Sequence, residues 1–201
     1  MVQERSLGDG VYFDEQAYPG IVRRLLIWIV DCLVLLALLV IAFLVAVLAG
    51  ILLVFSGEED PRVLAIIAWM GVLLFSWIYL TQLKRSKWRT VGYRLLDVKI
   101  VDLQGNRPSL WAMHVRLLLI LYWPFTPVIS LLWIGADKDR QTLRDCYAGV
   151  YLVRSNAVPV GTGPLHLVWY FALGHTLSYP RVQRNNPVPA FQQDDSAPPA
   201  N

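Results

Sequence analysis

An aspartate inside an otherwise apolar run is the first residue whose position needs a chemical explanation. Asp31 lies within Ile21 to Phe55, a run that contains only two other charged residues, Arg23 and Arg24. A carboxylate at the centre of a membrane helix costs about 2.5–3.5 kcal/mol on insertion scales, so it needs a partner. Arg24 precedes Asp31 by about 10 Å, or nearly two helical turns, which puts both side chains on one face. This gap is slightly too long for direct contact, so a bridging water or a second arginine is expected to close it.

Two roles for Asp31 fit this position. In the first, Asp31 forms an ion pair that anchors a helix bundle, because a buried charge is stable only when it is compensated. In the second, it binds a cation or carries a proton, as ionisable residues within membrane segments commonly do. The sequence leaves both roles open.

Other residue types that carry chemistry lack the required spacing. His114, His166 and His175 show no metal-ligand spacing with cysteines or acids. No serine or cysteine lies in a nucleophile motif, and no glycine pattern for phosphate binding occurs. Cys32 and Cys146 are too few for a disulfide scaffold and are expected to be reduced. We therefore predict a protein that is not an enzyme and needs no metal or other cofactor.

The segments that must position these residues are rich in hydrocarbon. Hydrophobic residues make up 56% of the 201 residues and charged residues only 16%, against about 25% charged in globular proteins. The apolar residues concentrate in Ile21 to Phe55 and Val63 to Leu83, each long enough to cross a membrane core of about 30 Å. The polar turn between the two runs is short. We predict two antiparallel transmembrane helices, at about 22–55 and 62–83.

A third apolar segment, at about 110–135, is less regular. Pro124 and Pro127 interrupt it, and proline removes a backbone donor from a helix. The segment is therefore either one kinked span or two short legs that leave the membrane on the side where they entered. The second alternative, which we favour, would let two predicted strands, Val98–Val101 and Val150–Val153, pair on one face of the membrane. The predicted fold is an all-α membrane protein with this Pro-broken third segment and a small cytoplasmic β element.

Composition divides the chain into three parts. Residues 1–20 are polar and turn-rich and form an N-terminal arm. Residues 21–154 hold the membrane domain. Residues 155–201 comprise a Gly/Pro linker, a short amphipathic segment at 165–177 that is expected to lie on the membrane surface, and a disordered tail.

The charges around the apolar runs predict the orientation in the membrane. Basic residues close to spanning segments mark the cytoplasmic side. Arg23 and Arg24 precede the first run and a basic stretch follows the second, whereas the connecting loop contains Glu58, Glu59 and Asp60. We expect a multi-pass protein with a cytoplasmic N-terminus.

The basic stretch after the second run has its own expected partner. It opens with four cations: Lys84, Arg85, Lys87 and Arg89. Beside a helix end, such a cluster typically contacts anionic lipid headgroups. We therefore predict the lipid bilayer and its headgroups as partners, and no nucleic acid.

Four sequence blocks combine arginine, aspartate and glycine in a specific order. They are Arg24-Leu-Leu-Ile-Trp-Ile-Val-Asp31, Arg89-Thr-Val-Gly92-Tyr-Arg94-Leu-Leu, Val-Asp102-Leu-Gln-Gly105-Asn-Arg-Pro-Ser109-Leu and Arg140-Gln-Thr-Leu-Arg-Asp145-Cys-Tyr-Ala-Gly149. Over roughly residues 18–154 the chain resembles the RDD family of bacterial membrane proteins, named for one arginine and two aspartates. The resemblance implies a location in the bacterial inner (plasma) membrane and signature residues Arg24, Asp31 and Asp145.

The second signature aspartate lies outside the apolar runs, among charged neighbours, so by itself it looks solvated. The resemblance implies that it folds back toward the membrane. We therefore expect a cytoplasm-facing cluster, nearly neutral in sum because buried charges must balance. Its expected members are Arg24, Asp31, Arg116 and Asp145, with Arg144 as an additional candidate.

Two functions follow from such a cluster. The protein transports an ion or small solute through its intramembrane Asp and Arg residues, in which case a homo-oligomer is needed because so few spans seldom enclose a pathway. Alternatively, it is a non-transporting accessory or scaffold protein that docks a membrane partner, and the Arg/Asp cluster is structural.

Overall fold

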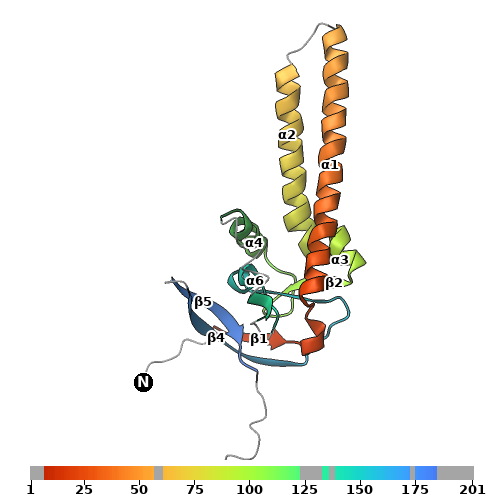
Figure 1. Ribbon diagram of the computed structural model, residues 1–201. Coiled ribbons are helices and arrows are strands. Elements are labelled where there is room, and N and C mark those ends of the chain that lie inside the picture. Colours follow the sequence, from red (N-terminus) through yellow and green to blue (C-terminus); the bar gives the residue numbers. More distant parts are fainter. Residues whose placement is uncertain (1–6, 57–60, 123–132, 136–138, 173–174, 185–201) are drawn as a thin grey trace, which may run out of the picture.

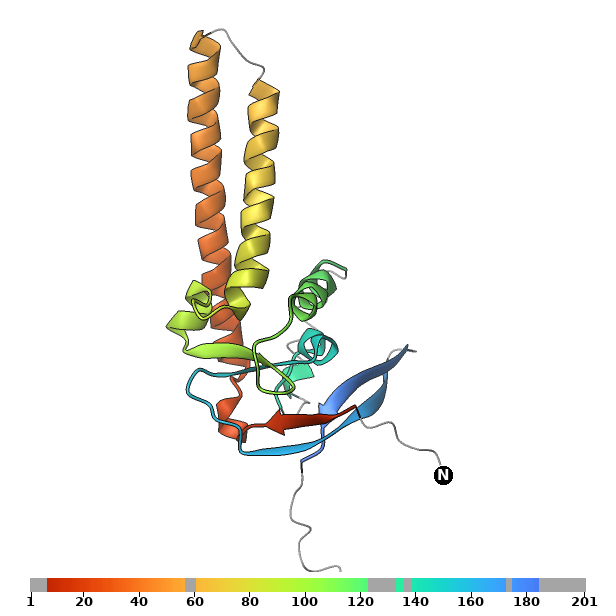
Figure 2. The ribbon, with the colours of Figure 1, turned by 180° about the vertical axis from the view of Figure 1, so that it is seen from behind.

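Two long antiparallel helices rise from a base of short helices and strands (Figures 1 and 2). This computed structural model describes residues 7–56, 61–122, 133–135, 139–172 and 175–184. α1 (Ile21–Ser56) follows Pro19 and Gly20 and contains no proline, so its 36 residues form a rod about 54 Å long. α2 (Pro61–Ile78) begins with a proline at its first position, where a backbone N–H would have no helical partner. The two predicted antiparallel helices are confirmed.

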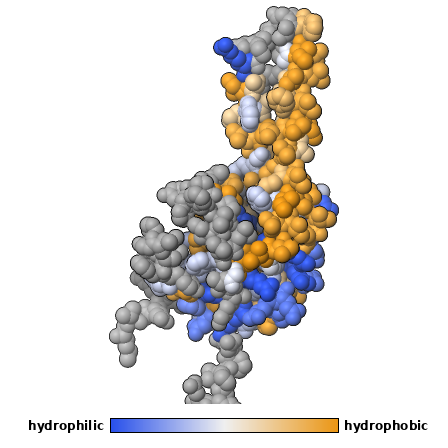
Figure 3. All heavy atoms as spheres, in the orientation of Figure 1, coloured by the Kyte–Doolittle hydropathy of each residue, from blue (hydrophilic) through white to orange (hydrophobic). Residues whose placement is uncertain are grey.

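The helical hairpin exposes its hydrocarbon. None of the most apolar 18-residue stretch of α1 is buried, and only 11% of the corresponding stretch of the second span, Ala65–Leu83, which starts in α2 and continues past its end, is buried. Figure 3 shows hydrophobic residues over this face of the hairpin and hydrophilic residues gathered at its base. Both helices are long and apolar enough to be candidate membrane spans. A core helix of a soluble protein would be buried, so this surface needs lipid or an apolar partner to cover it.

The base is not all-α, which corrects the predicted fold class. The described residues contain five strands in two sheets. In the smaller sheet, β2 (Val98–Asp102) pairs antiparallel with β3 (Val150–Arg154), so that Ile100 lies opposite Leu152. This is the pairing that we expected for the two strands if both lie on one face of the membrane.

Successive side chains of a strand point to opposite sides, and in the β2–β3 ribbon the side chains on both faces are buried. One face packs toward the other sheet in a cluster that contains Phe13, Tyr18, Val101, Leu103, Tyr151, Val153, Leu165 and Val182. The opposite face packs against the helices in a cluster that contains Ile27, Tyr93, Val98, Ile100, Met113, Val150 and Leu152. The ribbon is therefore the middle layer, and it fixes where the helices meet.

The larger sheet joins the two ends of the chain. β1 (Asp9–Tyr12) pairs with β4 (Gly161–Ala172), which pairs with β5 (His175–Val182). The segment predicted to be amphipathic, 165–177, falls on these strands wherever the structure describes it; Leu165 is buried in the core between the sheets, whereas Leu167 and Trp169 are exposed. The arm and the region after 154 are thus parts of one base rather than separate flanks. The tail predicted to be disordered was placed at Tyr179 to Asn201; its first residues belong to β5, and residues 185–201 lie outside the described residues.

Short helices complete the base. These are η1 (Glu15–Ala17), η2 (Tyr79–Leu83), α3 (Val91–Leu95), α4 (Leu110–Tyr122) and α6 (Leu143–Ala148). The described part of the predicted third membrane segment is α4; Pro124 and Pro127 lie outside the described residues. Trp77 Nε1 donates to His114 Nε2 at 3.0 Å, which docks α4 against α2. Among the described residues, no three metal-ligating side chains gather.

Candidate functional site: two buried carboxylates

Asp145 is completely buried, and each of its oxygens accepts a hydrogen bond from an arginine of another helix. Arg116 of α4 donates from Nε to Oδ1 at 2.6 Å. Arg24 of α1 donates from Nη1 to Oδ2 at 2.7 Å. Both arginines are themselves buried. One carboxylate therefore joins the first turn of α1 to α4 and α6.

Local hydrogen bonds at the start of α6 fix the orientation of the Asp145 carboxylate. Thr142 is the N-cap of α6, and its Oγ1 accepts from the backbone N–H of Asp145 at 3.2 Å. The Asp145 carboxylate in turn accepts from the backbone N–H of Thr142 at 3.3 Å, which completes a capping box. Gly149, at φ +61°, ends the helix in the left-handed conformation and turns the chain directly into β3.

The surroundings of Asp145 carry more positive than negative charge. Burial alone would raise the pKa of Asp145, but Arg116, Arg24 and Arg144 together lower it well below its ordinary value. Arg144 is half-buried, and its enclosed Nε has no hydrogen-bond partner. Burial and the neighbouring Arg116 lower the pKa of Arg144 to about 10. With three guanidinium groups around one carboxylate, this cluster has a net charge of +2 when all four groups are ionised.

Asp31 forms a second, separate centre at the end of the hairpin. Its Oδ1 accepts from the hydroxyl of Tyr79 and from the backbone N–H of Gly92, both at 3.0 Å. Its Oδ2 accepts from Thr90 Oγ1 at 3.2 Å and forms an ion pair with Lys84 Nζ at 3.1 Å. Asp31 is 2% exposed, and all its partners come from residues 79–92. The aspartate therefore ties α1 to the chain that leaves α2.

The close approach of α3 to α1 depends on a glycine. A Cβ on Gly92 would lie 2.7 Å from the backbone oxygen of Ile27 and 2.8 Å from Asp31 Oδ1. Real Cβ contacts are almost never this short, so α3 would have to move away from α1. The N–H of Gly92 is one of the donors to Asp31, and it would move with α3.

We therefore expect Gly92→Ala to destabilise the protein by about 1–3 kcal/mol, the usual cost of overpacking. The measurement is thermal unfolding of the purified protein in detergent, followed by circular dichroism. Gly71→Ala is the matched control, because a Cβ on Gly71 of α2 meets nothing within 4 Å and alanine favours a helix. Equal unfolding temperatures for the two variants would show that α3 does not pack this closely.

Tyr93 connects the two centres. Its hydroxyl accepts from Arg116 Nη1 at 2.9 Å, and its ring lies 5.3 Å from Lys84 Nζ, within the range of a cation–π contact. Tyr93 is 1% exposed. A chain of contacts thus runs from Asp31 through Lys84, Tyr93 and Arg116 to Asp145.

The structure divides the predicted cluster into two parts. It brings Arg24, Arg116 and Asp145 into direct contact, with Arg144 close enough to influence the Asp145 carboxylate. It does not join Arg24 to Asp31, although the two share one helix. The partner of Asp31 is Lys84, a residue that we assigned to lipid headgroups. The predicted near-neutral set is therefore one balanced pair and one positively charged cluster.

The remaining cations of the basic stretch have different surroundings. Arg89 donates to the backbone oxygen of Val98 at 3.1 Å, and Arg85 is half-buried with an enclosed Nε. Lys87 is exposed. Of the four cations predicted to contact headgroups, Lys87 is thus the exposed one.

Sequence reasoning did not identify Lys84, Tyr79, Thr90, Gly92 or Tyr93 as partners of these centres. Tyr79 lies within the second apolar run, where nothing in the local pattern marks it as a partner of Asp31. One feature of the sequence could have identified Lys84. It directly follows the second apolar run, which is predicted to be antiparallel to the run that contains Asp31. A cation at the base of one helix can then reach an acid near the base of its neighbour.

Comparison with known proteins gives one match. The model of the RDD family matches residues 18–149, a range that begins just before α1, includes both carboxylate centres and ends at the last residue before β3. No curated protein and no solved structure matches the chain. Family membership and two long apolar helices together indicate a membrane protein. Because the family model covers well over half of the sequence, the chain belongs to the RDD family.

Proposed function

We propose that this protein is a non-transporting accessory or scaffold protein of the bacterial inner membrane, in which the two carboxylate centres lock the helical hairpin onto a cytoplasmic base. The proposal rests on one observation: every carboxylate oxygen of the two aspartates already has a hydrogen-bond or ion-pair partner. Both oxygens of Asp31 and both oxygens of Asp145 are occupied by donors of the protein itself. A site for a transported cation needs carboxylate oxygens that are free to bind it.

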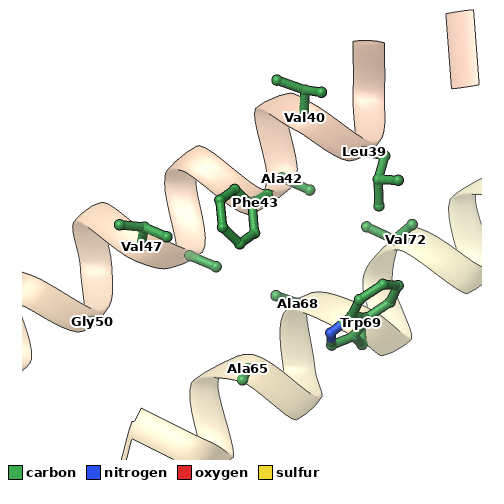
Figure 4. Close-up of a pocket in the computed structure, with 11 residues that line it drawn as sticks. Leu39, Val40, Ala42, Phe43, Val47, Gly50, Ala65, Ala68, Trp69 and Val72 are labelled. Atoms are coloured by element: carbon green, nitrogen blue, oxygen red, sulfur yellow. The ribbon is translucent and has the colours of Figure 1, made fainter. Parts of the chain in front are cut away.

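The space between the candidate spans supports the same conclusion. A cavity of about 550 Å³ lies between α1 and α2, and Figure 4 shows its labelled lining residues on the two helices. Every lining side chain is aliphatic or aromatic, from Leu39 to Gly50 on α1 and from Ala65 to Val72 on α2. The one polar side-chain group of this lining is the indole N–H of Trp69, a donor, so a cation moving along the cavity would find no side-chain oxygen to replace its water. We expect lipid chains or the helix of a membrane partner or second copy to cover it.

The strand pairing supports a placement of the whole base on one side of the membrane. β2 precedes the 110–135 segment and β3 follows it, and the two strands pair along five residues. A single crossing between them would put the strands on opposite faces, so we infer that the segment returns to the side where it entered. Exposed tryptophans near the base, Trp28, Trp88 and Trp111, are suited to the headgroup region. By the positive-inside rule, this side is the cytoplasm.

The test is a flux measurement on purified full-length protein in proteoliposomes. We expect proton and sodium flux equal to that of protein-free liposomes, across an imposed pH or sodium gradient. A sodium/proton antiporter reconstituted in parallel shows that the assay detects transport. Wild-type flux above background that Asp31→Asn abolishes, with the variant still folded, would exclude the accessory role.

One observation favours transport as a second candidate. The counter-ion of Asp31 is a lysine, a compact charge on a flexible stem that can move aside more readily than the rigid fork of an arginine. It follows η2, a π-helical turn, and such turns often occur at functional sites. In this case a cation or proton would displace Lys84 from Asp31. Lys84→Arg would then block flux while preserving the ion pair, whereas the accessory role predicts that Lys84→Arg changes no flux.

A further inference from the structure

A cavity of about 660 Å³ lies beside the first turn of α1, at the base of the hairpin. It is an open cavity, lined by Gly20 to Arg23, Leu26, Leu96, Ile134, Gly135 and Arg140. The two ionisable residues of the wall are both arginines. The cavity therefore combines positive charge with hydrocarbon in one place.

Both arginines are available to a ligand. Within the described residues, Arg23 has no ion pair, and it is half-buried. Arg140 is exposed, and its one hydrogen bond is from Nη1 to the backbone oxygen of Tyr18 at 3.3 Å. A guanidinium has five N–H donors, so most donors of Arg140 remain free. Neither arginine is neutralised by an acid of the described chain.

Arg140 is held at this cavity by an unusual backbone. Its φ is +47°, in the left-handed region that residues other than glycine seldom adopt. Its Nη1 would lie 3.7 Å from a Cβ built on Gly20. This is an ordinary van der Waals distance, so the guanidinium lies against the start of α1.

Two further sources of positive potential lie behind the cavity. The adjacent Arg24 belongs to the Asp145 cluster, which has a net charge of +2. The first N–H groups of α1 have no helical acceptor, and Gly20, which precedes them, has no side chain to cap them. Charge complementarity therefore specifies an anionic ligand.

The apolar part of the wall distinguishes a lipid from a free anion. Val22 is 71% exposed and Leu26 is 44% exposed, and both lie on α1, beside the arginines and along the direction of the candidate span. A small anion would not use this hydrocarbon. An acyl chain would cover it while the headgroup stays at the level of the arginines.

We propose that this cavity binds an anionic phospholipid, whose phosphate is bound by Arg23 and Arg140 and whose acyl chain lies against Val22 and Leu26. The proposal rests on the membrane location of the protein but not on the absence of transport. It differs from the expected headgroup contacts of residues 84–89, since none of these residues lines the cavity.

Native mass spectrometry of the full-length protein in detergent tests the site. Phosphatidylglycerol and phosphatidylcholine with identical acyl chains are titrated, and the first bound lipid is quantified. We expect wild-type protein to bind phosphatidylglycerol at least tenfold more tightly. At the usual strength of one basic residue near a lipid surface, Arg23→Gln and Arg140→Gln should each weaken this binding about fivefold, and the double variant about twenty-fivefold.

Arg154→Gln is the matched control, because it removes one charge from an exposed arginine of β3 outside the cavity and should leave the first lipid bound. Equal binding of the two lipids by the wild-type protein would overturn the proposal, whether or not the variants fold. Displacement of the lipid by equimolar inorganic phosphate would also overturn it and would identify a site for a free anion. Wild-type affinity in a folded double variant would place the lipid elsewhere.

Discussion

Asp145→Asn is expected to destabilise the protein by about 3–5 kcal/mol, the cost of removing one partner from a buried ion pair. The variant leaves Arg24 and Arg116 buried without a counter-charge, beside Arg144. An amide nitrogen would also face one of the two guanidinium groups, donor against donor. Folded protein in the membrane fraction should fall sharply, and the unfolding temperature in detergent should fall with it.

Asp9→Asn is the matched control for this substitution. Asp9 lies in β1, is exposed and forms no ion pair within the part of the chain that the structure describes, so the same chemical change should shift the unfolding free energy by less than about 0.5 kcal/mol. If Asp145→Asn were as stable as Asp9→Asn, the carboxylate would not be what holds α1, α4 and α6 together.

The same residue makes a pH-dependent contribution with a definite sign. Because the pKa of Asp145 is lowered in the folded protein, its contribution is fully present above the pKa of an unfolded aspartate, about 3.9. It is lost as the pH falls from there toward the lower folded pKa. The difference in unfolding free energy between wild type and Asp145→Asn should therefore be constant from pH 7 to about 5 and should shrink below about pH 4. A difference that shrinks between pH 7 and 5 would contradict the lowered pKa.

Asp31→Asn is expected to cost about 3 kcal/mol, at the lower end of the range for a buried pair. The reason for the lower value is Lys84, whose side chain is 16% exposed and can recover some hydration when its partner is lost. Adding Lys84→Met should restore part of the stability, because it removes the uncompensated ammonium. Chemical or thermal unfolding of the two single variants and the double variant measures this coupling, which we expect to exceed about 1 kcal/mol.

Lys87→Met tests whether that coupling is specific. Lys87 carries the same charge three residues further along the chain but is exposed, so combining it with Asp31→Asn should give additive changes. Restoration by Lys87→Met equal to that by Lys84→Met would mean that net charge, not the ion pair, explains the effect.

The sequence by itself determined the parts of this protein that depend on local patterns. Unbroken apolar runs and a short polar turn were enough for the antiparallel α1 and α2, because helix length and loop length leave no other arrangement. β-branched residues identified β2 and β3. The four blocks around Arg24, Gly92, Asp102 and Asp145 were enough for the family, since their order and spacing are specific.

Only the tertiary structure decided which charges meet. Arg24 and Asp31 share a helix face, but about 10 Å separates them along the axis, and each has a closer partner from a distant segment. Arg24 pairs with Asp145, because the β2–β3 ribbon brings α4 and α6 to one side of α1. Asp31 pairs with Lys84, and the same ribbon places α3 beside Ile27 of α1. The β1–β4–β5 sheet was missed for a related reason: strand pairing between the two ends of the chain is a long-range contact, and the apolar 165–177 segment carries no local signal for its partner. Local sequence specifies periodicity and length, whereas ion pairs and sheet edges are specified by distances across the fold.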